Sequence, residues 1–95
     1  MADFAVYILA SQRNGTLYTG STGNIVRRLE EHRSGVVAGF TQTHSVKLLV
    51  HLETYLTIDE ARVREAALKR WRRDWKIALI EEHNPDWRDL AQDLA

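Results

Sequence analysis

The sequence predicts a small α+β domain in which helices flank a three-stranded antiparallel sheet, in the order β-β-α-β-α-α. Residues 4–10 and 17–20 are rich in β-formers, and the turn between them contains Asn14-Gly15, a strong short-range hairpin signal. Helical apolar spacing follows the hairpin and is interrupted by one more β-rich run, at residues 46–53. The 95 residues, 44% of them apolar, predict a single compact domain over residues 1–95.

Each predicted hairpin strand carries one tyrosine, Tyr7 in the first and Tyr18 in the second. Because strand side chains alternate between faces, any hairpin loop with an even number of residues places both tyrosines on one face. A four-residue loop at 11–14 would put them directly opposite each other. A two-residue Asn-Gly turn would keep the shared face but offset them along the strands.

A helix is predicted to begin at Ile25, with Asn24 as its N-cap. Ile25 and Leu29 mark its buried side, and at about 100° per residue Arg28 and His32 fall within the same sector. We therefore expect one guanidinium and one imidazole to lean toward the sheet and its tyrosines. Taken singly, each has an ordinary alternative: half-buried strand tyrosines, a surface arginine, and a histidine that caps the helix C-terminus.

The sequence of the second half of the chain predicts three further helical segments after the third strand. Thr57 and Glu60 form a capping box that opens a helix running to about Arg73. A second helix is expected at 74–82, and after the break at Asn84-Pro85 a final short helix at 86–94. The long helix has an apolar stripe, made of Ile58, Ala61, Leu68, Trp71 and Trp75.

Two acidic residues stand out in these elements. Glu53, at the end of the third strand, could face solvent or the site, and we favour a structural role. Glu65 projects onto the edge of the apolar stripe, where a carboxylate is costly unless it is paired or binds a metal. It would either form an ion pair with Arg28 or Arg72, or bind a divalent cation. A single glutamate suffices in principle for Mg²⁺, which is commonly bound by only one or two carboxylates.

The distribution of charge and the cysteine content indicate which partners and which cellular compartment are possible. The formal net charge is zero, but residues 62–76 contain seven basic residues against two acidic ones, and the chain after Glu81 is acidic. This pattern indicates either a solvated helix face or a basic face that binds nucleic acid. The absence of cysteine excludes disulfides and fits a cytoplasmic protein. The N-terminus lacks a signal-peptide pattern, and its apolar run is too short to span a membrane.

Several short motifs along nearly the whole chain carry a family resemblance. They comprise Ala5-Val6-Tyr7, Tyr18-Thr19-Gly20, Arg28, His32, residues 39–41, Glu53, residues 60–73 and residues 84–90. Together they resemble the GIY-YIG nuclease family, in particular its small single-domain bacterial members, predicted endonucleases related to the excision-repair nuclease module. The sequence departs from the family pattern at three positions: Ala5 replaces glycine, Thr19 replaces isoleucine and His44 replaces tyrosine.

The resemblance implies a metal-dependent endonuclease that hydrolyses DNA phosphodiester bonds in repair or processing, leaving a 5′-phosphate and a 3′-hydroxyl. It assigns catalytic roles to five residues: Tyr7, Tyr18, Arg28, His32 and Glu65. Glu65 would hold Mg²⁺ or Mn²⁺, and DNA would be bound by four arginines: Arg27, Arg28, Arg72 and Arg73. Tyr7 would act as general base or orient the attacking water. Because a free phenol has a pKa of about 10, the arginine and the metal would have to lower it. The alternative is a nucleic-acid-binding module of the same fold with little or no catalysis.

Overall fold

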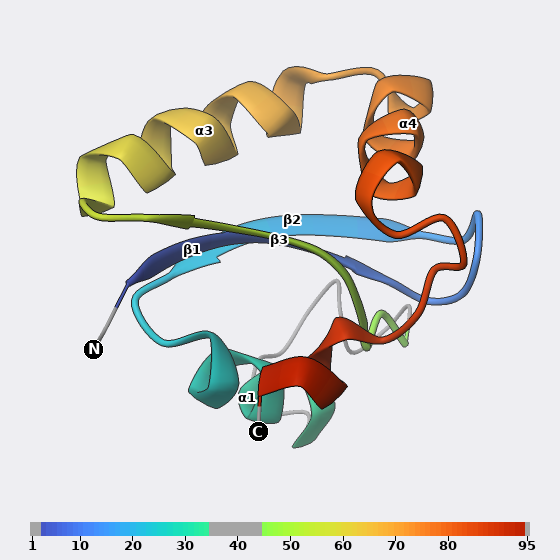
Figure 1. Ribbon diagram of the computed structural model, residues 1–95, viewed down its shortest axis with the longest axis horizontal. Helices are drawn as coiled ribbons and strands as arrows, with labels where there is room; N and C mark the ends of the chain where they lie inside the picture. The colour runs from blue at the N-terminus through green and yellow to red at the C-terminus, as the bar shows by residue number, and fades with distance from the viewer. Residues whose placement is uncertain (1–2, 35–44, 95) are drawn as a thin grey trace.

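The fold class predicted from sequence is confirmed in a computed structural model that describes residues 3–34 and 45–94 (Figure 1). The hairpin consists of β1 (Phe4–Ala10) and β2 (Leu17–Thr22), and α1 (Ile25–Ser34) follows it. After β3 (Leu48–Tyr55) come α3 (Ile58–Arg70), α4 (Arg73–His83) and a 3-10 helix, η1 (Leu90–Leu94). Residues 39–41 and His44, which belong to the family resemblance, lie outside the described residues.

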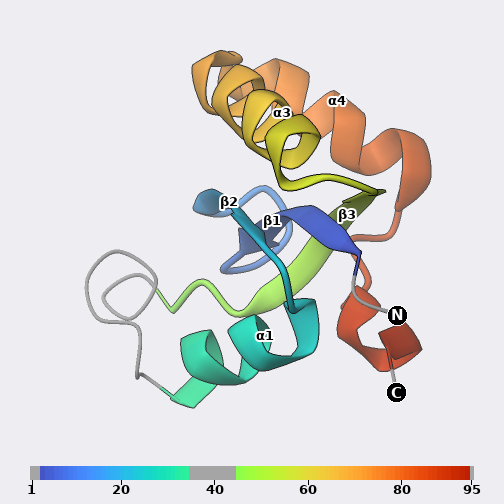
Figure 2. The same cartoon turned by 90° about the vertical axis from the view of Figure 1, so that its left-hand side faces the viewer.

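The three strands form one antiparallel sheet in the order β2-β1-β3, so β2 and β3 are its edges. Helices α3 and α4 cover one face, whereas α1 and η1 cover the other (Figures 1 and 2). Alternate residues of β1 supply both sides of the core: Tyr7 and Leu9 pack toward α1, while Val6 and Ile8 pack toward α3 and α4. The central strand is therefore buried on both faces.

The hairpin register decides how the two tyrosines meet. Tyr7 pairs with Gly20 and Tyr18 pairs with Leu9. The loop comprises residues 12–15 and is closed by a hydrogen bond from the Ser11 amide to the Thr16 carbonyl, 3.0 Å long. The predicted shared face is confirmed, but the directly opposite pairing is wrong. The chain uses an even loop that begins one residue later, which offsets the tyrosines by two positions.

Both predicted helix starts are present. The Asn24 side chain accepts a hydrogen bond from the Arg27 amide at 3.1 Å, and Thr57 accepts one from the Glu60 amide at 3.2 Å. Such caps satisfy amides that have no partner within the helix.

The long helix is shorter than predicted. Helix α3 ends at Arg70, since Trp71 and Arg72 adopt extended backbone angles, and α4 begins at Arg73. The predicted stripe is therefore wrong at two positions, because Trp75 belongs to α4 and is 50% exposed, and Ile58 is 41% exposed. The break lets α4 turn back across the sheet, where Ile80 packs against Ile8 and Val50. Helix burial is decided here by the direction of α4, which periodicity does not specify.

The C-terminal segment covers the outer edge of β3 instead of forming an α-helix from residue 86. Asn84 donates through Nδ2 to the Val50 carbonyl at 3.1 Å, and Asp89 accepts from the Leu49 amide at 3.3 Å. The Trp87 side chain is buried beside them. These contacts satisfy backbone groups that an edge strand would otherwise leave open. Asn84 thus has a structural role.

Candidate active site

The buried side chains of Tyr7 and His32 meet on the α1 face of the sheet. The Tyr7 hydroxyl lies 3.1 Å from Nε2 of His32, and both residues are almost fully buried. Tyr18 completes an aromatic cluster, with its ring centroid 6.4 Å from that of Tyr7 and 5.3 Å from that of His32. The structure therefore brings together three of the five residues assigned from sequence. His32 does lie in the last turn of α1, but its side chain is buried inside the domain and contacts Tyr7.

Gly20 makes room for this contact. A Cβ atom at Gly20 would lie 2.6 Å from the Tyr7 hydroxyl oxygen and 2.7 Å from its Cζ atom. Real side chains do not approach so closely, so the Tyr7 phenol can cross β2 only where the strand lacks a side chain. The glycine of the second motif is thus explained by packing of the first motif's tyrosine.

Burial shifts the pKa values of Tyr7 and His32 in opposite directions. Burial, with the nearby Tyr18, raises the pKa of Tyr7 well above its usual value, although the Arg28 charge opposes the shift. Burial and the Arg28 charge lower the pKa of His32. At neutral pH the phenol is therefore protonated and the imidazole is neutral, so the phenol can donate to Nε2. The Arg28 charge acts in the direction expected from the sequence, but without a metal it does not outweigh the effect of burial on the Tyr7 pKa.

Arg28 and Arg27 lie together at the start of α1. They line a hollow of about 360 Å³, whose other walls are Thr22, Gly23, Asn24 and Glu31. Each arginine is 3.5 Å from a Glu31 carboxylate oxygen, and both side chains keep substantial exposure. Two guanidinium groups beside the first turn of a helix suit a phosphate group.

Glu65 approaches the hairpin from the opposite face of the sheet. One of its oxygens accepts a hydrogen bond from the Ser21 hydroxyl, and the other lies 2.6 Å from Nζ of Lys69. Burial would raise the pKa of Glu65, but the contacts with Lys69 and Ser21 outweigh it, so the pKa is lowered and the group is ionised. Glu65 does form an ion pair, with Lys69 instead of the Arg28 or Arg72 considered above. The i,i+4 spacing of Glu65 and Lys69 was the available sequence signal for this pair.

Glu65 is the residue that would bind a divalent cation at this site. Within the described residues no group of three or more His, Cys, Asp or Glu side chains is arranged to hold a metal. One ionised carboxylate, 20% exposed on its side chain and next to a serine hydroxyl, fits a hard cation that keeps most of its waters. A site of this kind would be completed by substrate phosphate.

The two arginines assigned to DNA binding in the second half of the chain have structural partners. Arg72 is 3.3 Å from Asp74 and lies over the ring of Trp75, 4.8 Å from its centroid. Arg73 donates to the carbonyls of Asn14 and Gly15, both at 2.6 Å, and so ties α4 to the hairpin turn.

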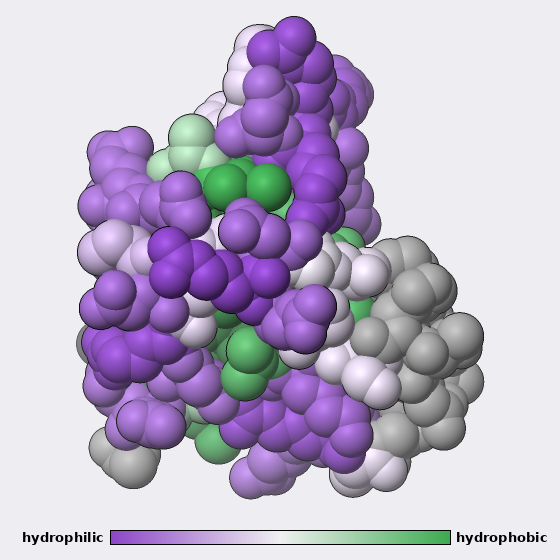
Figure 3. Space-filling view, turned by 90° about the vertical axis from the view of Figure 1, so that its right-hand side faces the viewer, coloured by the Kyte–Doolittle hydropathy of each residue, from purple (hydrophilic) through white to green (hydrophobic). Residues whose placement is uncertain are grey.

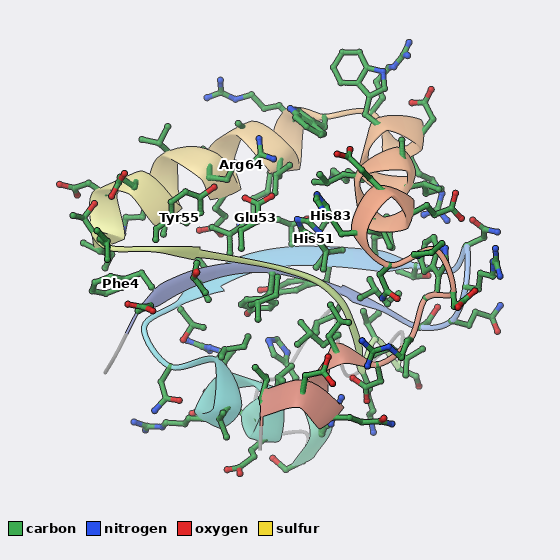
Figure 4. All side chains as sticks on the ribbon, viewed as in Figure 1. Phe4, His51, Glu53, Tyr55, Arg64 and His83 are labelled. Carbon is green, nitrogen blue, oxygen red and sulfur yellow. The ribbon has the colours of Figure 1, made fainter. Side chains whose placement is uncertain are left out.

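A second polar cluster lies between β3 and α3 (Figure 4). The Glu53 carboxylate accepts hydrogen bonds from Tyr55 at 2.7 Å and from Arg64 at 2.8 Å, and lies 2.8 Å from Nε2 of His51. These partners lower the pKa of Glu53 strongly despite its burial. The cluster supports the structural role favoured for Glu53. Its signal in the sequence was the two-residue spacing that puts residues 51, 53 and 55 on one strand face.

Comparison with known proteins places these features in a family. Residues 3–78 match the family model described as the GIY-YIG catalytic domain. A UPF0213 protein of Syntrophus aciditrophicus is 43% identical over 82 residues, covering 85% of this chain and 92% of the relative. A UPF0213 protein of Staphylococcus haemolyticus is 38% identical over 82 residues, covering 86% and 99%. The solution NMR structure of a UPF0213 protein from Bacillus halodurans superposes with a TM-score of 0.58 at 29% identity, covering 92% of each chain.

Proposed function

Because the chain belongs to the GIY-YIG family, we propose that it is a metal-dependent endonuclease that hydrolyses DNA phosphodiester bonds. One observation carries the proposal: the buried hydrogen bond between Tyr7 and His32 lies where the charges of both Arg28 and Glu65 act on the phenol. A proton relay, a cation for phosphate and an ionised carboxylate are the components that such hydrolysis requires.

The residues divide the chemistry as follows. Arg28, with Arg27, binds the scissile phosphate at the start of α1. Tyr7 takes a proton from the attacking water while passing its own proton to Nε2 of His32, so that hydroxide attacks phosphorus. The bond to the 3′-oxygen breaks, and that oxygen takes a proton from solvent to become the 3′-hydroxyl. Tyr18 packs against both rings and fixes their orientation. Glu65 would hold Mg²⁺ or Mn²⁺, which when bound stabilises charge on the phosphoryl and leaving oxygens.

The proposed substrate is DNA of unusual structure, as arises in repair or processing. The groups at this site are suited to phosphate oxygens, and phosphate contacts carry little sequence information. Selectivity would therefore come from the shape of the DNA, such as a branch, a nick, a lesion or an unpaired segment.

The alternative function, a binding module with little catalysis, has one specific observation in its favour. Lys69 already neutralises Glu65, and the Tyr7 phenol is deeply buried. A chain in which these contacts persist on DNA would bind phosphate without cutting.

The deciding experiment is incubation of the purified protein with branched, nicked and single-stranded DNA, with and without Mg²⁺ or Mn²⁺. We expect metal-dependent cleavage that is lost in Arg28→Ala and in Glu65→Gln. Arg13→Ala removes an exposed arginine near α4 and serves as the control, with cleavage retained. Binding without cleavage under every metal condition would favour the module, and absence of both would reject the proposal.

A further inference from the structure

We propose that Lys76, beside Arg73, binds a DNA backbone phosphate that flanks the scissile one, along the open edge of β2. This inference rests on the proposed nuclease function and names a binding position that the family motifs do not include. It concerns the α3 and α4 face of β2, on which Leu17, Thr19 and Ser21 lie.

The first step is the position of Lys76. With Arg73, Thr16 and Leu17 it lines a hollow of about 270 Å³ beside the start of β2. Leu17 and Ser21 are four residues apart on the strand, which spans about 13 Å at the usual strand rise. Because Ser21 binds Glu65, the hollow lies too far from the proposed metal position to receive the same phosphate. It suits a neighbouring one on the same strand.

The second step is the charge around Lys76. Among the ion pairs of residues 3–34 and 45–94, none gives Lys76 an acidic partner, whereas Lys69 is held by Glu65. Burial, with the positive charge of Lys69 nearby, lowers the pKa of Lys76. A partly buried ammonium group without an acidic partner costs folding energy, and an anion beside it would offset that cost.

The third step is the surrounding surface. The end of the molecule formed by α4 and the hairpin turn is mostly hydrophilic (Figure 3). Arg73 is fixed there by the Asn14 and Gly15 carbonyls, and a guanidinium has further N–H donors for a ligand. The hollow therefore offers one fixed and one movable cation to a phosphate.

The test measures binding, not cleavage. A fluorescently labelled single-stranded 20-mer is titrated in EDTA, and the dissociation constant is followed between 50 and 300 mM salt. We expect Lys76→Met to weaken binding about three- to fivefold at low salt, and to reduce the log–log salt slope by about 0.7, the value for one phosphate contact on a single strand. Lys76→Arg keeps the charge and should bind like the unmodified protein.

Lys47→Met is the matched control, since it removes the same charge at an exposed residue just before β3, on the far side of β1 from β2. Equal affinity and slope for Lys76→Met and the unmodified protein would overturn the inference, and metal-dependent cleavage by the unmodified protein would then leave the nuclease proposal standing. An unmodified protein that neither binds nor cuts DNA would overturn both.

Discussion

The Tyr7 hydroxyl lies 3.1 Å from Nε2 of His32 inside the domain, and this contact connects the two halves of the proposed proton relay. The phenol comes from the central strand and the imidazole from α1, 25 positions along the chain. Because burial raises the pKa of Tyr7 and lowers that of His32, the neutral pair is the stable form at pH 7. Catalysis would use transfer through the pair rather than a standing phenolate.

The first prediction concerns the pH dependence of cleavage. His32 can accept a proton only while it is neutral, and its pKa lies below the ordinary value of about 6.5. The single-turnover rate should therefore be level from pH 7 to 8 and decline only below pH 6.5. Tyr7→Phe should remove cleavage at every pH while leaving DNA binding intact. An acid limb centred above pH 7 would assign the titrating group elsewhere.

The second prediction concerns Gly20. Gly20→Ala should displace the Tyr7 phenol and destabilise the fold by about 1–3 kcal/mol, as overpacking of a core does. Cleavage should fall further than the remaining folded fraction explains. Gly23→Ala is the control for stability, because a Cβ there would lie 3.5 Å from Phe4, an ordinary contact. Denaturant titration of both variants measures stability, and the cleavage rate of Gly20→Ala is compared with that of the unmodified protein. Equal destabilisation by Gly20→Ala and Gly23→Ala would contradict the packing role.

The third prediction concerns the competition between Lys69 and a cation for Glu65. Lys69→Met should raise the affinity for Mn²⁺ about three- to fivefold, since an exposed ion pair contributes under about 1 kcal/mol. The free Mn²⁺ signal in electron paramagnetic resonance measures this without any cleavage. Lys47→Met should leave the affinity unchanged, and Glu65→Gln should abolish binding. Unchanged affinity in Lys69→Met would show that the ammonium does not compete.

The fourth prediction concerns stability and acid. The Glu53 pKa is depressed in the folded state, so its stabilising contribution is present above the unfolded pKa of about 4.3 and is lost as the pH falls below it. Glu53→Gln should cost about 2 kcal/mol at pH 7 and progressively less below pH 4.3. Unfolding by urea at pH 7, 5 and 3 measures the difference, with Glu82→Gln, an exposed acid of α4, as control. A difference between Glu53→Gln and the unmodified protein that does not change with pH would refute the role of this charge.

Local rules were sufficient for much of the fold and for the residue types of the site. The even hairpin loop fixed the shared face of Tyr7 and Tyr18, and the caps at Asn24 and Thr57 marked two helix starts. They failed at Trp71 and Arg72, where α3 ends although the apolar spacing continues, because no glycine or proline marks the break. They also missed the contacts of Glu53 with Arg64 and of Arg73 with the hairpin turn, which join distant segments.

By itself the sequence determined the antiparallel sheet, the element order and the family to which the chain belongs, since these follow from local periodicity, turn chemistry and motif spacing. Only the tertiary structure decided that His32 receives the Tyr7 hydroxyl, that Gly20 makes space for it, and that Lys69 holds Glu65. The physical reason is that burial and pairing depend on how the helices cross the sheet. The way in which the helices cross the sheet sets the pKa values of Tyr7, His32 and Glu65. The residue pattern of a single helix or strand does not specify how the helices cross the sheet.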